Sequence, residues 1–147
     1  MTERERNQAA KAWLKRYGDA REDVRRLQME WKELQARQEG ADAIKYSDMP
    51  KACLSDADLS DMMVQREKVA KRITKAMTKA YGIMNAVGAA IDEVEDPMAR
   101  TVLSLRYITL RSWDDICEEM RYSWTRVHEL HRKGLGEIWR ITKYEKV

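Results

Sequence analysis

One short segment of the chain, residues 121–133, gathers side chains that can recognise nucleic acid. Guanidinium and ammonium groups bind phosphate, hydroxyls can meet the nucleic-acid backbone, and an Arg fork can pair with the edge of a guanine. The candidate DNA-binding residues are Arg121, Ser123, Trp124, Thr125, Arg126, His128, Glu129, Arg132 and Lys133. The chemistry indicated is noncovalent recognition of double-stranded DNA. Arg126 is the leading base or phosphate contact, and Arg132 and Lys133 are better suited to phosphate.

Several of these residues also have simpler structural explanations. Helix capping alone would account for Ser123. Trp124 fits two interpretations, packing against the first helix of its domain or lying on the sugars and thymine methyl groups of DNA. His128 and His131 are three residues apart, a spacing that metal sites use, but no Cys or carboxylate completes a tetrahedral set. We therefore expect a solvated or phosphate-facing pair of histidines on the outer face of the helix, and no metal.

The carboxylates of the chain do not form a recognisable catalytic site. Asp114, Asp115, Glu118 and Glu119 form an acidic cluster, and its first two members suit the positive N-terminal end of a helix. Acid–base catalysis also needs a pocket and an oriented nucleophile, and neither is visible in the sequence, nor is a phosphate-cradling Gly loop. The sequence predicts a protein that is not an enzyme, with no catalytic residue and no cofactor.

The candidate residues lie in a segment, Asp96 to Ile141, that has the start and turn signals of three short helices. Asp96 and Pro97 are typical of a helix start, Ser112 and Asp115 have the spacing of a capping box, and Ser123 opens a third helix. A tight turn around Arg121 and Tyr122 links the second helix to the third. This pattern predicts a helix-turn-helix, which presents its last helix to the major groove of DNA.

We expect the three helices to enclose a small apolar core. Its predicted members are Val102, Leu103, Leu105, Tyr107, Ile108, Ile116, Met120, Val127, Leu130, Leu135 and Ile138. Residues 121–147 carry seven Lys or Arg against three Asp or Glu, although the formal charge of the whole chain is only +3. The basic character is therefore concentrated on the predicted recognition helix and its tail.

The first part of the chain has the periodicity of a long helix. Apolar residues recur at alternating spacings of three and four, which is a heptad seam, and predict a helix from Thr2 to Gln38 with a local kink at Gly18. The seam consists of Ala10, Trp13, Tyr17, Ala20, Val24, Leu27, Trp31 and Leu34. Residues 39–55 lose this period and contain Gly40 and Pro50, so we expect a loop that reverses the chain.

A second long helix is predicted from Ser55 or Asp56 to Glu95, with two apolar stripes. One stripe consists of Met62, Val69, Ile73, Ala76, Ala80, Ile83, Val87, Ala90 and Val94, and the other of Met63, Ala70, Met77, Met84 and Ile91. The first stripe can bury the preceding helix, and the second requires a further partner. That partner is either the C-terminal helices or a second copy of the chain, and a homodimer would strengthen weak DNA contacts.

The predicted fold is all-α, a long antiparallel helical hairpin in a packing or oligomerisation domain (1–95) followed by a DNA-binding helix-turn-helix domain (96–147). Cys53 and Cys117 lack a spacing that suggests a disulfide or a metal site, which favours free thiols in a reducing compartment. No signal peptide or bilayer-length apolar run occurs. We expect a cytoplasmic protein of a bacterial cell with no membrane partner.

The C-terminal residues resemble the fourth region of bacterial primary sigma factors. The runs VLSLRY, SWDDICEEM and YSWTRVHELHRKGLGEI follow the order of that family over about 45 residues, and the rest of a sigma factor is absent. The resemblance implies that Trp124, Thr125, Arg126 and Glu129 face DNA, with Arg126 and Glu129 reading bases. Gly134 and Gly136 replace helix-favouring residues of that pattern, which predicts a bent or frayed recognition helix.

The whole chain resembles short phage and prophage proteins of Gram-positive bacteria, including the ArpU-type and related regulators of late operons. The segment YSDMPKACLSDADLSDMMVQREKV is similar to the linker and second-helix start of a phage family of this kind. The resemblance implies a sequence-specific transcriptional regulator that acts on DNA with RNA polymerase. Two alternatives stay open: a small-terminase-like subunit that recognises DNA for phage packaging, and a protein that docks on polymerase and barely touches DNA.

Overall fold

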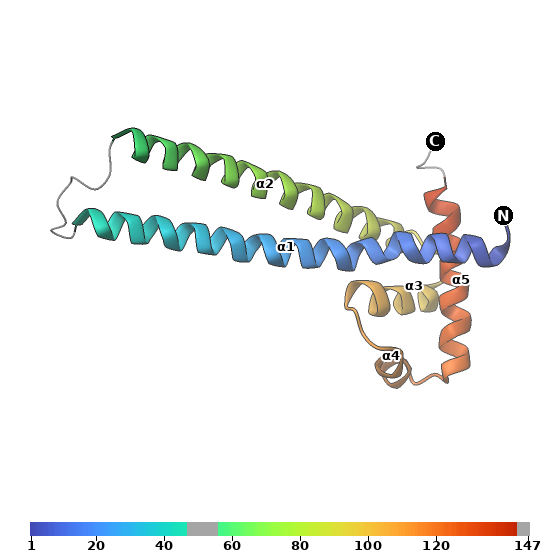
Figure 1. The fold of residues 1–147 in the computed structure, drawn as a ribbon. Helices are drawn as coiled ribbons and strands as arrows, with labels where there is room; N and C mark the ends of the chain where they lie inside the picture. Colours follow the sequence, from blue (N-terminus) through green and yellow to red (C-terminus); the bar gives the residue numbers. More distant parts are fainter. Residues whose placement is uncertain (47–55, 144–147) are drawn as a thin grey trace. The chain divides into compact units, whose positions relative to one another are not determined.

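The computed structural model describes residues 1–46 and 56–143, and within these ranges every regular element is helical (Figure 1). The elements are α1 (Glu3–Tyr46), α2 (Asp56–Asp92), α3 (Pro97–Leu103), the π-helical segment η2 (Ser104–Ile108), α4 (Trp113–Met120) and α5 (Trp124–Thr142). The prediction of an all-α fold is confirmed. None of the helices in the described ranges has an apolar stretch long enough to cross a lipid bilayer.

The chain divides into two compact units that differ from a simple split between hairpin and helix-turn-helix. The larger unit consists of residues 1–21 and 82–147, and the smaller unit consists of residues 22–81. The first turns of α1 and the last turns of α2 therefore belong to the same compact unit as α3, α4 and α5. The functional division at residue 95 stays a prediction.

In the smaller unit, α1 and α2 pair in antiparallel orientation. Val24 and Leu27 of α1 are buried, as is Ile73 of α2, all three at positions of the predicted seams. Across the pair, Arg72 Nη2 lies 2.7 Å from Glu30 Oε2. Both partners of this ion pair are substantially exposed, so it contributes at most about 1 kcal/mol and the apolar seam supplies most of the stability.

The end of α1 differs from the sequence prediction. The helix continues eight residues beyond Gln38, through Gly40 to Tyr46, so the expectation of a loop from residue 39 is wrong. Glycine costs a helix about 1 kcal/mol but does not block its hydrogen bonds, and the proline that would block them comes only at Pro50. The rest of the predicted loop, including Pro50 and Cys53, lies outside the described residues. The predicted second helix is confirmed as α2, which begins at Asp56 as expected and ends at Asp92, three residues before the predicted Glu95.

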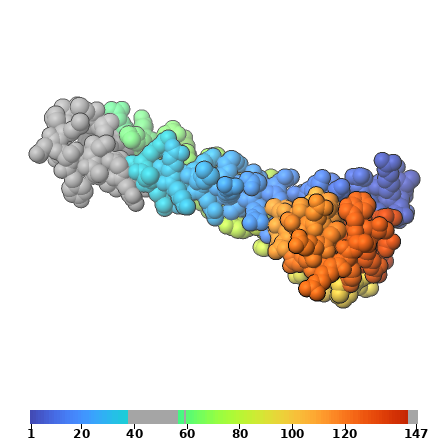
Figure 2. All heavy atoms as spheres, turned by 90° about the horizontal axis from the view of Figure 1, so that it is seen from below, coloured from blue at the N-terminus to red at the C-terminus, as the bar shows by residue number. Residues whose placement is uncertain are grey.

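The core of the larger unit joins the ends of the hairpin to the C-terminal helices. Figure 2 shows the residues of the C-terminal helices, orange to red, gathered against the dark blue N-terminal residues of α1. The buried members of this core are Ala10, Leu14, Val87, Ala90, Ile91, Val94, Ala99, Leu103, Tyr107, Leu135 and Ile138. Ile91 belongs to the second stripe of α2, so that stripe packs against the C-terminal helices at this end.

A second, smaller core supports α4 and the start of α5. It consists of Val102, Ile116, Val127 and Leu130, with Leu105, Trp113, Cys117 and Met120 packed against it. The predicted core residues of the helix-turn-helix are thus buried or half-buried. Because this core lies between three short helices, it orients the first turns of α5 without using the long hairpin.

Candidate nucleic-acid interface

The turn between α4 and α5 has the geometry that the sequence predicts. Arg121 ends α4 in the left-handed backbone conformation (φ 58°, ψ 37°), and its N–H donates to the Cys117 carbonyl. Ser123 then caps α5, its Oγ accepting from the Arg126 N–H at 3.2 Å. Ser112 caps α4 in the same way, through the Asp115 N–H. The two caps and the left-handed residue determine where α5 begins.

The first helix of the helix-turn-helix begins as predicted and continues into a π-helical segment. Asp96 caps α3, its Oδ1 accepting from the N–H groups of Met98 and Ala99, and Pro97 occupies the first turn. After Leu103 the helix widens into η2, where the Thr109 N–H donates to the Ser104 carbonyl at 3.1 Å. Tyr107 lies in this wider turn and is buried in the core, as predicted.

The first two turns of α5 present an exposed face. Trp124 is 60% exposed, and Thr125, Arg126 and Glu129 are exposed beside it. Arg126 Nη1 lies 3.6 Å from Glu129 Oε2, and the Arg126 guanidinium lies 6.0 Å from the centre of the Tyr122 ring. Ion pairs this exposed are weak, so the Arg126 fork is free to exchange Glu129 for another partner. Of the candidate residues at the turn, Arg121 and Ser123 are also exposed.

Trp124 belongs to a row of stacked side chains, three aromatic rings and one guanidinium, that come from α5, α4 and η2. Its ring stacks on that of His128 with centroids 3.6 Å apart, and His128 lies 4.4 Å from the Trp113 ring of α4. Trp113 in turn has the Arg106 guanidinium 4.7 Å above it. The high exposure of Trp124 rules out the interpretation that it is a core residue packed on the first helix.

His131 corrects the prediction of two outward-facing histidines. It is 8% exposed, and its Nε2 lies 2.8 Å from the buried hydroxyl of Tyr107. Burial, with smaller effects from nearby cations, lowers the pKa of His131 from 6.5 to about 4, and burial raises the pKa of Tyr107 to about 12. His131 is buried against Tyr107 of η2 and Trp113 of α4, whereas His128, nearly one turn before it on α5, stays half-exposed.

The two candidate phosphate ligands Arg132 and Lys133 have different surroundings. Lys133 Nζ lies 2.7 Å from Asp96 Oδ2, the carboxylate that caps α3. Their hydrogen bond lowers the pKa of Asp96 and raises that of Lys133. A phosphate contact from Lys133 would therefore compete with this pair. Arg132 lies at the edge of a cavity formed with α1.

Gly134 and Gly136 do not bend α5, contrary to the expectation from their low helix propensity. The helix is continuous from Trp124 to Thr142. A Cβ on Gly134 would lie 2.9 Å from Leu103 Cδ1 and 3.0 Å from Leu103 Cγ, so α3 and α5 approach too closely there for a side chain. A Cβ on Gly136 would meet no atom within 4 Å. Gly134 is thus needed for packing between helices and does not act as a hinge.

Two further side chains hold the connection between α2 and α3, and sequence reasoning missed both. Arg100 donates from Nε and Nη2 to the Val94 carbonyl at 3.0 and 2.7 Å. Glu137 of α5 is 8% exposed, and its Oε1 accepts from the Glu95 N–H at 3.0 Å. A charged residue at a position of helical periodicity that faces the core is the signal that could have identified Glu137. Within the described residues, no group of three or more His, Cys, Asp or Glu side chains could hold a metal ion.

Comparison with known proteins gives a family but no activity. Residues 54–138 match the model of a family described as a protein of unknown function, DUF1492. The match covers more than half of the chain and extends into α5 as far as Ile138, so it includes the whole helix-turn-helix pattern except the last residues of α5. No curated protein and no solved structure matches the chain.

Proposed function

The chain belongs to the DUF1492 family, and we propose that it is a sequence-specific DNA-binding regulator of transcription, of phage or prophage origin, that acts beside RNA polymerase. The observation that carries the proposal is the exposed face of the first two turns of α5, which follows a tight turn and is oriented by its own small core. Helix-turn-helix proteins read bases with this part of their recognition helix. The resemblance to sigma region four supports the connection with polymerase.

The side chains on that face have complementary roles in the proposal. Arg126 reads a guanine through a bidentate pair, and Glu129 accepts from a cytosine amino group or orients Arg126. Trp124 lies on sugars or a thymine methyl, and Thr125 and His128 contact the backbone or a base edge. Arg121, Ser123, Arg132 and Lys133 meet the flanking phosphates.

The charge balance argues for an additional partner in the complex. Residues 96–147 carry ten Lys or Arg against eight Asp or Glu, so this segment attracts DNA only weakly. A second copy of the chain would double the contacts, and a polymerase bound at the same promoter would supply the missing affinity. We propose a homodimer on this ground. The proposed role in transcription implies that it acts in the cytoplasm of the bacterial cell.

The test compares a variant of the reading face with a matched variant elsewhere on α5. Genome-wide footprinting identifies the bound duplex, and its affinity is then measured for the wild type, Arg126→Ala and Arg140→Ala. Arg140 is also an exposed arginine, but it lies in the last turn of the helix. Losing a bidentate contact worth about 1–3 kcal/mol lowers the affinity roughly 5- to 150-fold, and Arg140→Ala should leave it within about twofold.

Two results would count against the proposal. If no duplex of the genome binds better than random DNA, the protein is not a specific reader. If Arg126→Ala binds its duplex as the wild type does, the first turn of α5 is not the reading surface. Affinity should also fall steeply with rising salt.

A second candidate function is docking on polymerase with little DNA contact, and the acidic face of α4 favours it. Asp114, Asp115 and Glu118 are exposed, and Glu119 pairs with Arg111. An exposed carboxylate cluster suits a basic protein surface. Polymerase binding that survives Arg126→Ala but is lost in Asp114→Asn/Glu118→Gln would favour this function over the first.

A further inference from the structure

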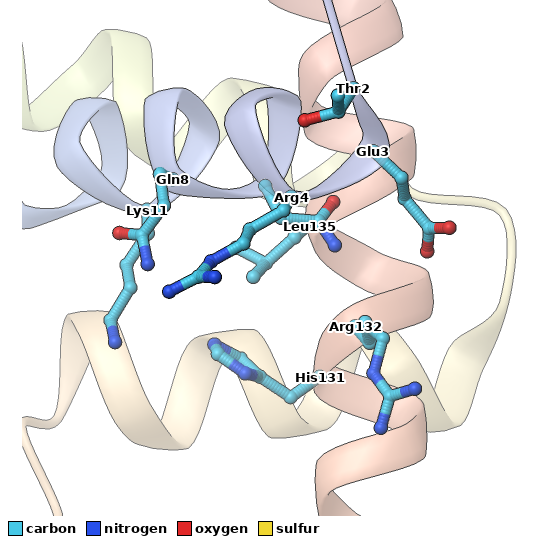
Figure 3. Close-up of a pocket in the computed structure, with 9 residues that line it drawn as sticks. Thr2, Glu3, Arg4, Gln8, Lys11, His131, Arg132 and Leu135 are labelled. Carbon is cyan, nitrogen blue, oxygen red and sulfur yellow. The ribbon is translucent and has the colours of Figure 1, made fainter.

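A cavity of about 540 Å³ lies between the first three turns of α1 and the middle of α5 (Figure 3). Its walls include Arg4 and Lys11 of α1, and Arg132 and Leu135 of α5, with His131 below them. A volume of this size is in the range of sites that hold small ligands. All of these residues belong to the larger unit, and of those named Arg132 alone also has a role in the proposed function, as a contact to a flanking phosphate.

The cavity has an excess of positive charge that the protein does not neutralise. Three of its lining residues are cations, Arg4, Lys11 and Arg132, and the one carboxylate is Glu3. Within the described part of the chain, the side chains of these three cations take part in no ion pair or hydrogen bond, whereas Lys133 next to them pairs with Asp96. Like charges that gather around a concave site without a counter-ion favour the binding of an anion.

His131 reports the same excess of positive charge from inside the larger unit. The residue is 8% exposed and lines the cavity, and its Nε2 is hydrogen-bonded to the Tyr107 hydroxyl. Every charged or titratable group that acts on it electrostatically is basic: Lys11 from α1, Arg106 from η2 and His128 from α5. Together with burial they hold the pKa of His131 at about 4. An anion in the cavity would reverse this effect, because it would stabilise the imidazolium.

We propose that this cavity binds a phosphate group through Arg4 and Lys11, with Arg132 at its edge. Figure 3 shows the Arg4 guanidinium above the ring of His131 and the Lys11 ammonium to the left of that ring, while Arg132 extends from α5 on the other side. An Arg fork and a Lys point charge are the usual pair of phosphate ligands. The phosphate belongs either to the backbone of DNA or to a free phosphate ester, and the site does not depend on the proposed reading face.

The site is tested by titrating the protein with inorganic phosphate and pyrophosphate against a chloride control of equal ionic strength. The imidazole resonances of His131 report occupancy, and the pKa of His131 should rise toward 6.5 when the anion binds. Arg4→Gln and Lys11→Gln should each weaken phosphate binding about tenfold, the loss of one charge-assisted hydrogen bond. The matched control is Lys15→Gln, an exposed lysine one turn further along α1 that does not line the cavity.

The outcomes show whether the cavity binds phosphate, whether that phosphate belongs to DNA or to a free ester, and whether a failure concerns this site or the proposed function. His131 resonances that respond to phosphate no more than to chloride would overturn the proposal, as would equal losses in Lys11→Gln and Lys15→Gln. If phosphate binds and competes with the footprinted duplex, the site holds a backbone phosphate. If phosphate binds equally to the free protein and to the DNA complex, the site holds a free phosphate ester. Failure of DNA binding in Arg126→Ala would leave the phosphate titration unchanged.

Discussion

Replacing Gly134 by alanine should destabilise the protein, although alanine is the better helix former. In the middle of a helix, Gly→Ala ordinarily stabilises by about 1 kcal/mol. At Gly134, however, the added Cβ would lie 2.9 Å from Leu103 Cδ1, and Leu103 is 0% exposed, so its side chain has no free space to move into. Forcing one methyl group into such a core costs about 1–3 kcal/mol.

Gly136 is the matched control for this prediction, because it lies in the same helix and its added Cβ would meet no atom within 4 Å. The gain in helix propensity is common to both variants and cancels in their difference. Gly136→Ala should therefore stabilise by about 1 kcal/mol, and Gly134→Ala should be less stable than Gly136→Ala by about 1–3 kcal/mol. Leu103→Ala, which removes the opposing atoms, should reduce this difference when combined with Gly134→Ala.

Urea unfolding followed by circular dichroism at equal protein concentration measures these differences, provided that the urea dependence of the free energy of unfolding is the same in each variant. If Gly134→Ala is as stable as Gly136→Ala, then α3 and α5 do not pack as closely as described, and the structural role assigned to Gly134 is wrong.

Three further predictions concern buried and exposed groups of the larger unit. Burial and nearby cations lower the pKa of folded His131 from 6.5 to about 4, so the unfolded chain binds a proton at a higher pH than the folded chain does. The free energy of unfolding should therefore fall by about 2 kcal/mol from pH 7 to pH 5. The loss should be smaller in His131→Gln. Glu137→Gln should leave the free energy of unfolding nearly unchanged, because the amide oxygen still accepts from the Glu95 N–H, whereas Glu137→Leu should cost about 1–3 kcal/mol. Trp124→Ala should change stability by less than about 0.5 kcal/mol, because the ring is 60% exposed, yet it should weaken binding to the footprinted duplex.

The same unfolding measurements and one binding measurement check all three. A pH dependence that is identical in wild type and His131→Gln would mean that His131 is not buried in its neutral form. Equal stability of the two Glu137 variants would remove the role of its hydrogen bond. A large loss of stability in Trp124→Ala would show that the ring is part of the core, and the loss of binding could then not be assigned to DNA contact.

Local features of the sequence were sufficient to predict the helices and their caps. Asp96, Ser112 and Ser123 were identified as caps from residue type and spacing alone, because a cap depends on hydrogen bonds to groups two or three residues away. The end of α1 is not predicted correctly from the lost apolar period and Gly40, because one glycine does not prevent a helix and α1 continues to Tyr46.

Contacts between distant segments could not be predicted in the same way. The sequence alone determined the class of fold, the positions of the helix starts and the exposed face of α5 except at His131, since helical periodicity and capping act within one or two turns. Only the tertiary structure decided that His131 is buried beside a cavity lined by the first turns of α1, that Gly134 packs directly against Leu103, and that Arg4 and Lys11 face α5 across that cavity. Each of these contacts joins residues more than 25 positions apart, and whether a polar or small residue is buried depends on the segment that packs against it.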